Sequence, residues 1–337
     1  MSLVKKPTFL YCPEAERNSA VSSGQPLGVP LDGNVQPKHS NLSFAIRFNM
    51  NTHTNSSRPD NRVVADHNEF KVLKLVRDFG HLVRIEVAEG VWPTSDTLVA
   101  QKMAQRTVKR LLKSRELLEM ENLLAGNSLV LGRRGAARLR MADIEADAGY
   151  DLSSVNGGQF KHRSYGTRYL IKRHARGHRV FGEYAIAKGW SPLTRKQFSA
   201  SFDKKIPDGL VLVPGPERGF DETVSAADWI EVECTDKSTK ELERILYVAW
   251  TYLGKCLDAE KTIILDRVII VFNEKERHER RIKQLLREYI SKHHTDNPDA
   301  LLASIILCRC KVDAPFVWHG HEEVDGATLL TESTHRR

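Results

Sequence analysis

Apolar residues recur at helical spacing between residues 66 and 142 and predict three helices there. The first helix is spaced by Phe70, Leu73, Val76 and Phe79. The second covers residues 83–92 and ends at Pro93, which cannot continue a helix. The third runs from residue 94 or 95 to residue 114 and opens with Ser, Thr and Asp, the residue types that cap helices. Its apolar side is predicted to bury Leu98, Val108, Leu111 and Leu112.

A β-hairpin is predicted directly after the third helix. Within residues 117–139, two short apolar runs flank Ala125-Gly126-Asn127, and Gly and Asn are typical of tight hairpin turns. Three helices followed by a hairpin are the order of a winged helix. Residues 66–142 are therefore predicted to form a winged helix-turn-helix DNA-binding domain.

The exposed side of the third predicted helix is basic. It carries five cations, and its single acid, Asp96, lies at the N-terminal end, where the helix dipole favours a negative charge. A helix pressed against a phosphate backbone requires such a face, although a solvated surface is the alternative interpretation. Arg138 and Arg140 add charge beside the predicted wing. The residues predicted to contact DNA are Lys102, Arg106, Lys109, Arg110, Lys113, Arg133 and Arg134.

The second half of the chain alternates helices and strands, which predicts a mixed α/β (α+β) domain over residues 174–315. The predicted elements are a helix at 175–188, strands after Pro207-Asp208 and at 229–234, a helix at 238–253, a strand at 262–272, a charged helix at about 274–293 and an apolar run at 301–308.

Three carboxylates stand at prominent positions of the two central strands. Asp208 precedes one apolar run, and Glu231 and Glu233 alternate with Ile230 and Val232 in the next, so that both glutamates share one face. Hard oxygen ligands of this kind suit Mg²⁺ or Mn²⁺, which act on phosphates. The alternative is that Asp208 occupies a turn and that the glutamates form a solvated strand face.

Pro207-Asp208 followed by Glu231-Val232-Glu233 resembles the core of the PD-(D/E)xK restriction-endonuclease-like superfamily. The resemblance implies a metal-dependent DNA endonuclease with Asp208, Glu231 and Glu233 as metal ligands. Glu233 stands at the position where the superfamily has a lysine, and Lys237 or Lys240 in the following helix is available for that role. The opening helix of the superfamily core contributes a further glutamate, here assigned to Glu183.

The order of all these parts resembles the replication-relaxation family of plasmid and integrative-element proteins. The residues that carry the resemblance are 104–112 (AQRTVKRLL), 129–139 (LVLGRRGAARL), His174, Pro207-Asp208-Gly209 and Glu231-Val232-Glu233. Membership would imply an N-terminal winged helix joined to an endonuclease-like domain. It would also imply a DNA-binding role in replication, relaxation or mobilisation of a plasmid or other mobile element, with the corresponding machinery as partners.

Two alternatives to a nuclease remain open at this point. In one, the nuclease fold is a catalytically silent scaffold, and a winged-helix regulator or accessory protein acts through DNA binding alone. In the other, the chain is a protein-interaction module without a DNA role. Whether the protein forms a homodimer is also open.

Composition sets outer bounds on these interpretations. The formal net charge of the 337-residue chain is +8, which favours polyanionic partners. Five cysteines without a CxxC pair support neither a disulfide framework nor a zinc ribbon. The absence of a secretory signal and of long apolar runs predicts a cytoplasmic protein without membrane contact. Residues 156–158 (NGG) lack the features of a P-loop, so no nucleotide or organic cofactor is expected.

The remaining segments are predicted to lie outside the two domains. Residues 1–65 are predicted to be a mostly disordered leader because they are rich in Ser, Asn, Pro and Gly. Residues 143–173 are predicted to be a linker, and residues 316–337 a C-terminal tail.

Overall fold

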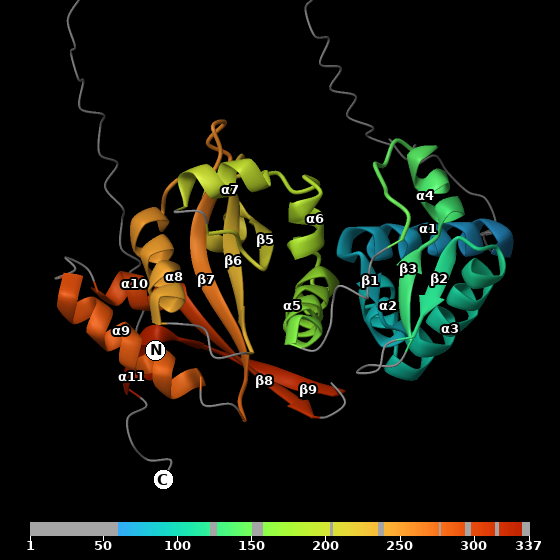
Figure 1. Cartoon of the computed structure of the whole chain (residues 1–337). Coiled ribbons are helices and arrows are strands. Elements are labelled where there is room, and N and C mark those ends of the chain that lie inside the picture. Colours follow the sequence, from blue (N-terminus) through green and yellow to red (C-terminus); the bar gives the residue numbers. More distant parts are fainter. Residues whose placement is uncertain are drawn as a thin grey trace, which may run out of the picture. The chain divides into compact units, whose positions relative to one another are not determined.

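The computed structural model describes most of the chain after residue 59 (Figure 1). All of the described residues belong to the compact unit formed by Ser57–Arg337. They are 60–121, 127–149, 158–202, 205–234, 239–275, 278–293, 298–313 and 317–331. Most of the predicted leader, and Lys237, lie outside them.

The N-terminal part of the described chain consists of helices and a small antiparallel sheet. The sheet has the strand order β1-β3-β2, so the hairpin made by β2 and β3 is extended by β1. The predicted three helices and hairpin are confirmed. In chain order the elements are α1 (Asn61–Phe79), β1 (His81–Leu82), α2 (Arg84–Val91), α3 (Thr97–Lys113), β2 (Leu117–Met120), β3 (Ser128–Leu131) and α4 (Arg133–Arg140).

Local chemistry explains where these helices begin and end. The Asp60 carboxylate accepts a hydrogen bond from the Arg62 backbone N–H, at 2.9 Å, and Gly80 ends α1 at a φ of 79°. The Asp96 carboxylate caps α3 by accepting from the backbone N–H groups of Leu98 and Val99, at 2.9 and 3.4 Å. These caps determine the residues at which α1 and α3 begin. The apolar faces of both helices share one core.

Two sequence predictions for this region are wrong. Helix α1 begins at Asn61, within the segment predicted to be a disordered leader. Leu98 was predicted to be buried, but 65% of its surface is exposed. Leu98 lies on the side of α3 opposite its buried side. The buried side consists of Ala100, Ala104, Thr107, Val108 and Leu111.

The rest of the described chain is built on a six-stranded mixed sheet with the order β4-β5-β6-β7-β8-β9 (Figure 1). Strands β6, β7 and β8 are parallel to one another, and the other pairs are antiparallel. The strands are β4 (Arg179–Gly182), β5 (Gly209–Pro214), β6 (Ser225–Glu233), β7 (Ile263–Asn273), β8 (Ile305–Asp313) and β9 (Val317–Asp325).

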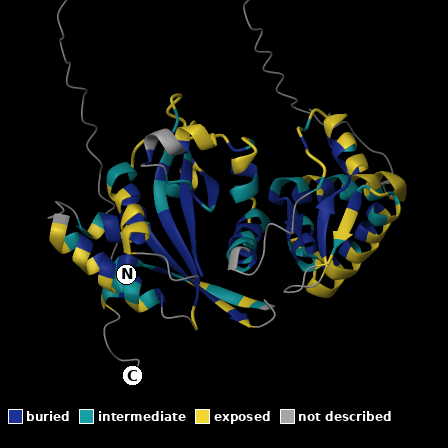
Figure 2. Ribbon diagram, viewed as in Figure 1, coloured by how far each residue is buried: buried dark blue, intermediate teal, exposed yellow. Residues whose placement is uncertain are grey.

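Helices cover both faces of this sheet, and the central strands are buried (Figure 2). Helix α5 (Gly158–Ala175) packs on the face that carries Ile230 and Val232. The opposite face, which carries Trp229, is covered by several helices. These are α7 (Arg195–Ser201), α8 (Thr239–Tyr252), α9 (His278–His293), α10 (Pro298–Ser304) and α11 (Gly326–Thr331). Short helices α6 (Glu183–Ala187) and η1 (Gly215–Arg218) connect strands.

The edges of the sheet differ from the sequence predictions. The segment 175–188 was predicted as one helix, but it contains β4, which pairs with β5 and is followed by α6. The predicted linker contains most of α5, and the predicted tail contains β9 and α11. Strand β9, with the sequence VWHGHEEVD, carries too few apolar residues to be recognised, because its pairing with β8 supplies backbone hydrogen bonds rather than an apolar face.

Candidate functional site

The exposed side of α3 is the first candidate site. All five of its predicted DNA contacts are exposed, and α3 itself contains no Asp or Glu. Arg110 also forms an ion pair with Glu69 on α1, with Nε and Oε1 2.6 Å apart. The other cations of α3, Lys102, Arg106, Lys109 and Lys113, form no ion pair with another described residue.

The cations of α4 have different roles. Arg133 and Arg134 are exposed, and Arg134 donates to the Ser114 backbone carbonyl at the end of α3, at 3.2 Å. Arg138 instead binds the carboxylates of Asp66, Glu69 and Glu116, which holds α4 against α1. The predicted contacts Arg133 and Arg134 therefore lie beside the end of α3, while Arg138 is a structural residue.

A small cavity brings together two of the predicted catalytic carboxylates, Asp208 and Glu183. Its volume of about 20 Å³ is room for about one water molecule. The side chains of His81, His162 and Arg163 also line it. Burial and the nearby Arg163 charge lower the pKa of His81 to about 4, so this imidazole is neutral at physiological pH.

Each carboxylate in the cavity has a side-chain partner on α5, which is Arg163 for Glu183 and His162 for Asp208. Glu183, the first residue of α6, forms a two-point ion pair with the Arg163 guanidinium, at 2.9 and 3.2 Å. The Asp208 carboxylate accepts from the Val232 backbone N–H at 2.8 Å and lies 3.2 Å from Nε2 of His162. Asp208, the residue directly before β5, therefore contacts both β6 and α5.

Glu231 lies on the other side of the sheet. It shares a face with Trp229, whose indole N–H donates to it at 2.7 Å, and Lys205 Nζ lies 2.6 Å from its second oxygen. Glu231 and Glu233 are 0% and 1% exposed, so the predicted alternation along β6 is confirmed and a solvated strand face is ruled out.

The described structure does not bring the predicted catalytic carboxylates to one place. Asp208 and Glu183 meet at the cavity beside α5, and Glu231 meets Lys205. Within the described ranges, no three His, Cys, Asp or Glu side chains are grouped so as to hold a metal ion. Lys240 is exposed in the first turn of α8.

The sequence analysis missed three partners of these carboxylates, namely His162, Arg163 and Lys205. His162 and Arg163 lie on α5, in the segment predicted to be a linker, although apolar residues from Phe160 to Ile171 recur there. Lys205 lies three residues before Asp208, and no motif or periodicity in the sequence singled it out.

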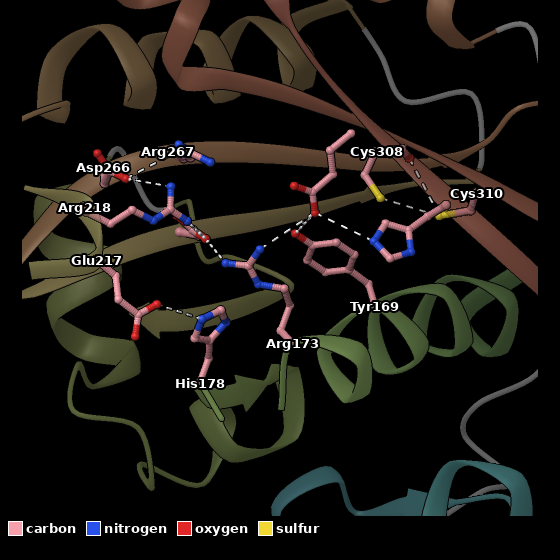
Figure 3. Close-up of polar contacts among 12 residues, drawn as sticks. Tyr169, Arg173, His178, Glu217, Arg218, Asp266, Arg267, Cys308 and Cys310 are labelled. Carbon is pink, nitrogen blue, oxygen red and sulfur yellow. Dashed lines mark hydrogen bonds and ion pairs between the residues drawn. The ribbon is translucent and has the colours of Figure 1, made fainter. Parts of the chain in front are cut away.

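A buried polar network, also missed, ties α5 to the sheet (Figure 3). Asp228 on β6 is 0% exposed and lies 2.7 Å from a guanidinium nitrogen of Arg173 and 3.0 Å from one of Arg218. Tyr169 donates to Glu323 at 2.9 Å. Burial raises the pKa of Asp228 to about 6 against the opposing effect of the two arginines. The centre of this network, Asp228 and Arg173, is enclosed, while Arg267 at its outer end is partly exposed.

Replacing Glu86 in α2 by glutamine is expected to change how stability depends on pH. Burial raises the pKa of Glu86 to about 7, against the nearby Arg168 charge and the Val83 N–H that donates to it. A raised carboxyl pKa favours folding at low pH, and this contribution is lost as the pH rises through 7. The wild type should therefore lose about 3 kcal/mol relative to Glu86→Gln between pH 4 and pH 8. Urea unfolding across this range measures the difference, and a constant difference would contradict the assignment.

Comparisons of the chain with protein-family models, with curated proteins and with solved structures found no match. Among the described helices, none combines the length and the apolar content needed to cross a lipid bilayer.

Proposed function

We propose that this protein binds duplex DNA through residues 60–140, acting as a winged helix. The chain order α1, β1, α2, α3, β2, β3 and the sheet order β1-β3-β2 support this assignment. Residues 92–96 connect α2 to α3, which makes α3 the second helix of a helix-turn-helix and the element that enters the major groove.

The observation that carries the proposal is the charge of the exposed side of α3. Lys102, Arg106, Lys109 and Lys113 face solvent on a helix without acids, and Arg133 and Arg134 lie near its end. A polyanion is the partner that such a surface favours, since each phosphate contact releases condensed counterions.

We further propose that the sheet domain is an endonuclease-like domain of the PD-(D/E)xK kind. Support comes from α5, the antiparallel strands β4, β5 and β6, and the α8 crossover to the parallel strand β7. For this activity Asp208 and Glu231, which lie on opposite sides of the sheet, would have to come together around Mg²⁺ or Mn²⁺, and the metal would supply a Lewis acid for the scissile phosphate. Glu183, Glu233, Lys240 and Lys237 are the other residues proposed for this site, with Lys237 outside the described residues.

A catalytically silent scaffold is the second candidate, and specific contacts favour it. Glu233 occupies the position of the lysine, Glu183 and Glu231 each contact a protein cation in place of a metal, and Asp208 contacts the His162 imidazole. In that case the winged helix would carry the function, as a regulator or accessory protein in plasmid or mobile-element replication, relaxation or mobilisation.

Supercoiled plasmid incubated with Mg²⁺ or Mn²⁺ separates the two candidates. If the domain is a nuclease, we expect nicking that EDTA abolishes and that falls by at least about 100-fold in Asp208→Asn and Glu231→Gln. Asp208→Asn keeps an acceptor for the Val232 N–H, and Asp221→Asn, an exposed acid in the turn before β6, is the control.

Binding is followed in parallel by gel shift. Equal shifts without nicking in either metal would establish the silent scaffold. No shift at 50 mM salt would overturn the DNA-binding proposal itself.

A further inference from the structure

We propose that Leu98 and Gln105 on α3 read base edges in the major groove, so that the preferred DNA site contains A·T base pairs. This inference rests on the DNA-binding function proposed above. To DNA binding it adds the side chains that recognise the sequence and the bases that they recognise.

The first observation is an aliphatic side chain exposed at the start of α3. Leu98 is 65% exposed and its neighbour Val99 is 49% exposed, although α3 has an apolar face available for packing. A surface helix normally turns its aliphatic residues toward the core and charged or polar residues toward solvent. Most of the Leu98 side chain is therefore left uncovered by the described part of the chain.

The second observation is where Leu98 lies relative to the cations. At 100° per residue, the positions of Leu98, Lys102, Gln105 and Lys109 fall within about 60° of arc around the helix axis. All four are exposed. This arc lies opposite the buried side of α3, so it is the part of the helix that would face the floor of a groove.

The spacing along the helix fits a short run of base pairs. Leu98 and Gln105 are separated by about 10 Å along the axis, at 1.5 Å per residue. Base pairs stack at 3.4 Å, so this length covers about three steps. The N-terminal half of a recognition helix is the part that contacts base edges, and both residues lie in it or at its end.

The chemistry of these two side chains selects the bases. A glutamine amide forms two hydrogen bonds with N6 and N7 of adenine, and an aliphatic side chain contacts the C5-methyl group of thymine. Gln101 and Val99 flank the arc with the same two chemistries. Arg106 and Lys113, which lie outside this arc, would bind phosphates, which position the helix without carrying sequence information.

The surrounding charge favours DNA over a protein as the partner that covers Leu98. Lys102 and Arg106 lie next to Leu98 and Gln105 on the helix, and α3 offers no acid to a basic partner. An isolated aliphatic contact enclosed by cations suits a thymine methyl group beside phosphates.

The test begins with a pool of 40-bp duplexes that contain a randomised 20-bp core. Wild-type protein selects from the pool at 150 mM salt, and the retained duplexes are sequenced. We expect enrichment of a site with adenine and thymine about three base-pair steps apart.

Binding of the enriched duplex and of the unselected pool is then compared by fluorescence anisotropy at 50 mM salt. Gln105→Ala and Leu98→Ala should each lose affinity for the enriched duplex, by about tenfold for Gln105→Ala. Neither should change affinity for the pool. Lys113→Ala is the control, because it should weaken binding to both and reduce the salt slope by about 1. All three residues are exposed, so thermal unfolding should be unchanged.

The outcomes distinguish this inference from the proposed function. Retention of the pool without enrichment of any base would overturn the inference and leave DNA binding intact. Equal losses for both duplexes in Gln105→Ala would also overturn it. Unchanged binding of the enriched duplex in Leu98→Ala would overturn the assignment of Leu98 as a reader. No retention of the pool at 50 mM salt would overturn DNA binding.

Discussion

Replacing Lys102, Arg106 and Lys109 together by alanine is expected to lower the affinity for a 30-bp duplex by roughly 10²- to 10³-fold at 0.1 M salt. The three cations are exposed on one side of α3 and form no ion pair with another described residue, so their removal should not disturb the fold. Each lost phosphate contact removes about 0.9 from the slope of log affinity against log salt concentration. Fluorescence anisotropy between 50 and 300 mM salt measures both the affinity and the slope.

A variant of equal charge change provides the control. Arg280, Arg287 and Lys292 are exposed on α9, in the sheet domain. If α3 makes the contact, replacing these three by alanine should leave the affinity within about threefold of wild type. Equal losses in both variants would show that net charge, rather than the surface of α3, attracts DNA.

Replacing Arg173 by alanine is expected to destabilise the protein by about 3–5 kcal/mol at pH 7.5. Arg173 is 4% exposed and lies 2.7 Å from Asp228, which is 0% exposed. Removing it would leave the carboxylate buried with Arg218 as its remaining close cation, 3.0 Å away. Urea unfolding with an unchanged m-value measures the loss.

The loss should also depend on pH. The pKa of Asp228 is raised to about 6, so the carboxyl group is largely protonated at pH 5 and the ion pair with Arg173 is then weak. The destabilisation should therefore be smaller at pH 5 than at pH 7.5. Equal losses at both pH values would contradict a role for the ion pair and indicate lost packing instead.

The matched control for Arg173 is Arg267 at the outer end of the same network. Its side chain is 36% exposed and lies 3.5 Å from Asp266. Because exposed ion pairs are screened by water, Arg267→Ala should cost at most about 1 kcal/mol.

The sequence by itself determined the local features of this protein. The period of apolar residues placed α1, α2 and α3, and the Ser/Thr/Asp cluster at 94–96 marked the start of α3 to within three residues, because both signals depend on neighbours within one or two helical turns. The alternation along β6 likewise assigned Glu231 and Glu233 to one face and Ile230 and Val232 to the other. The cations of α3 were predicted to be exposed for the same reason, and they are.

Only the tertiary structure decided which groups meet. His162 reaches Asp208 from α5, and Lys205 reaches Glu231, because strand pairing and helix packing bring distant segments together. The edge strands β4 and β9 were missed because an edge is held by backbone hydrogen bonds, which leave little trace in side-chain pattern. The burial of Glu231 and Asp228 and the exposure of Leu98 also depend on what covers each residue, and a local pattern does not contain that information.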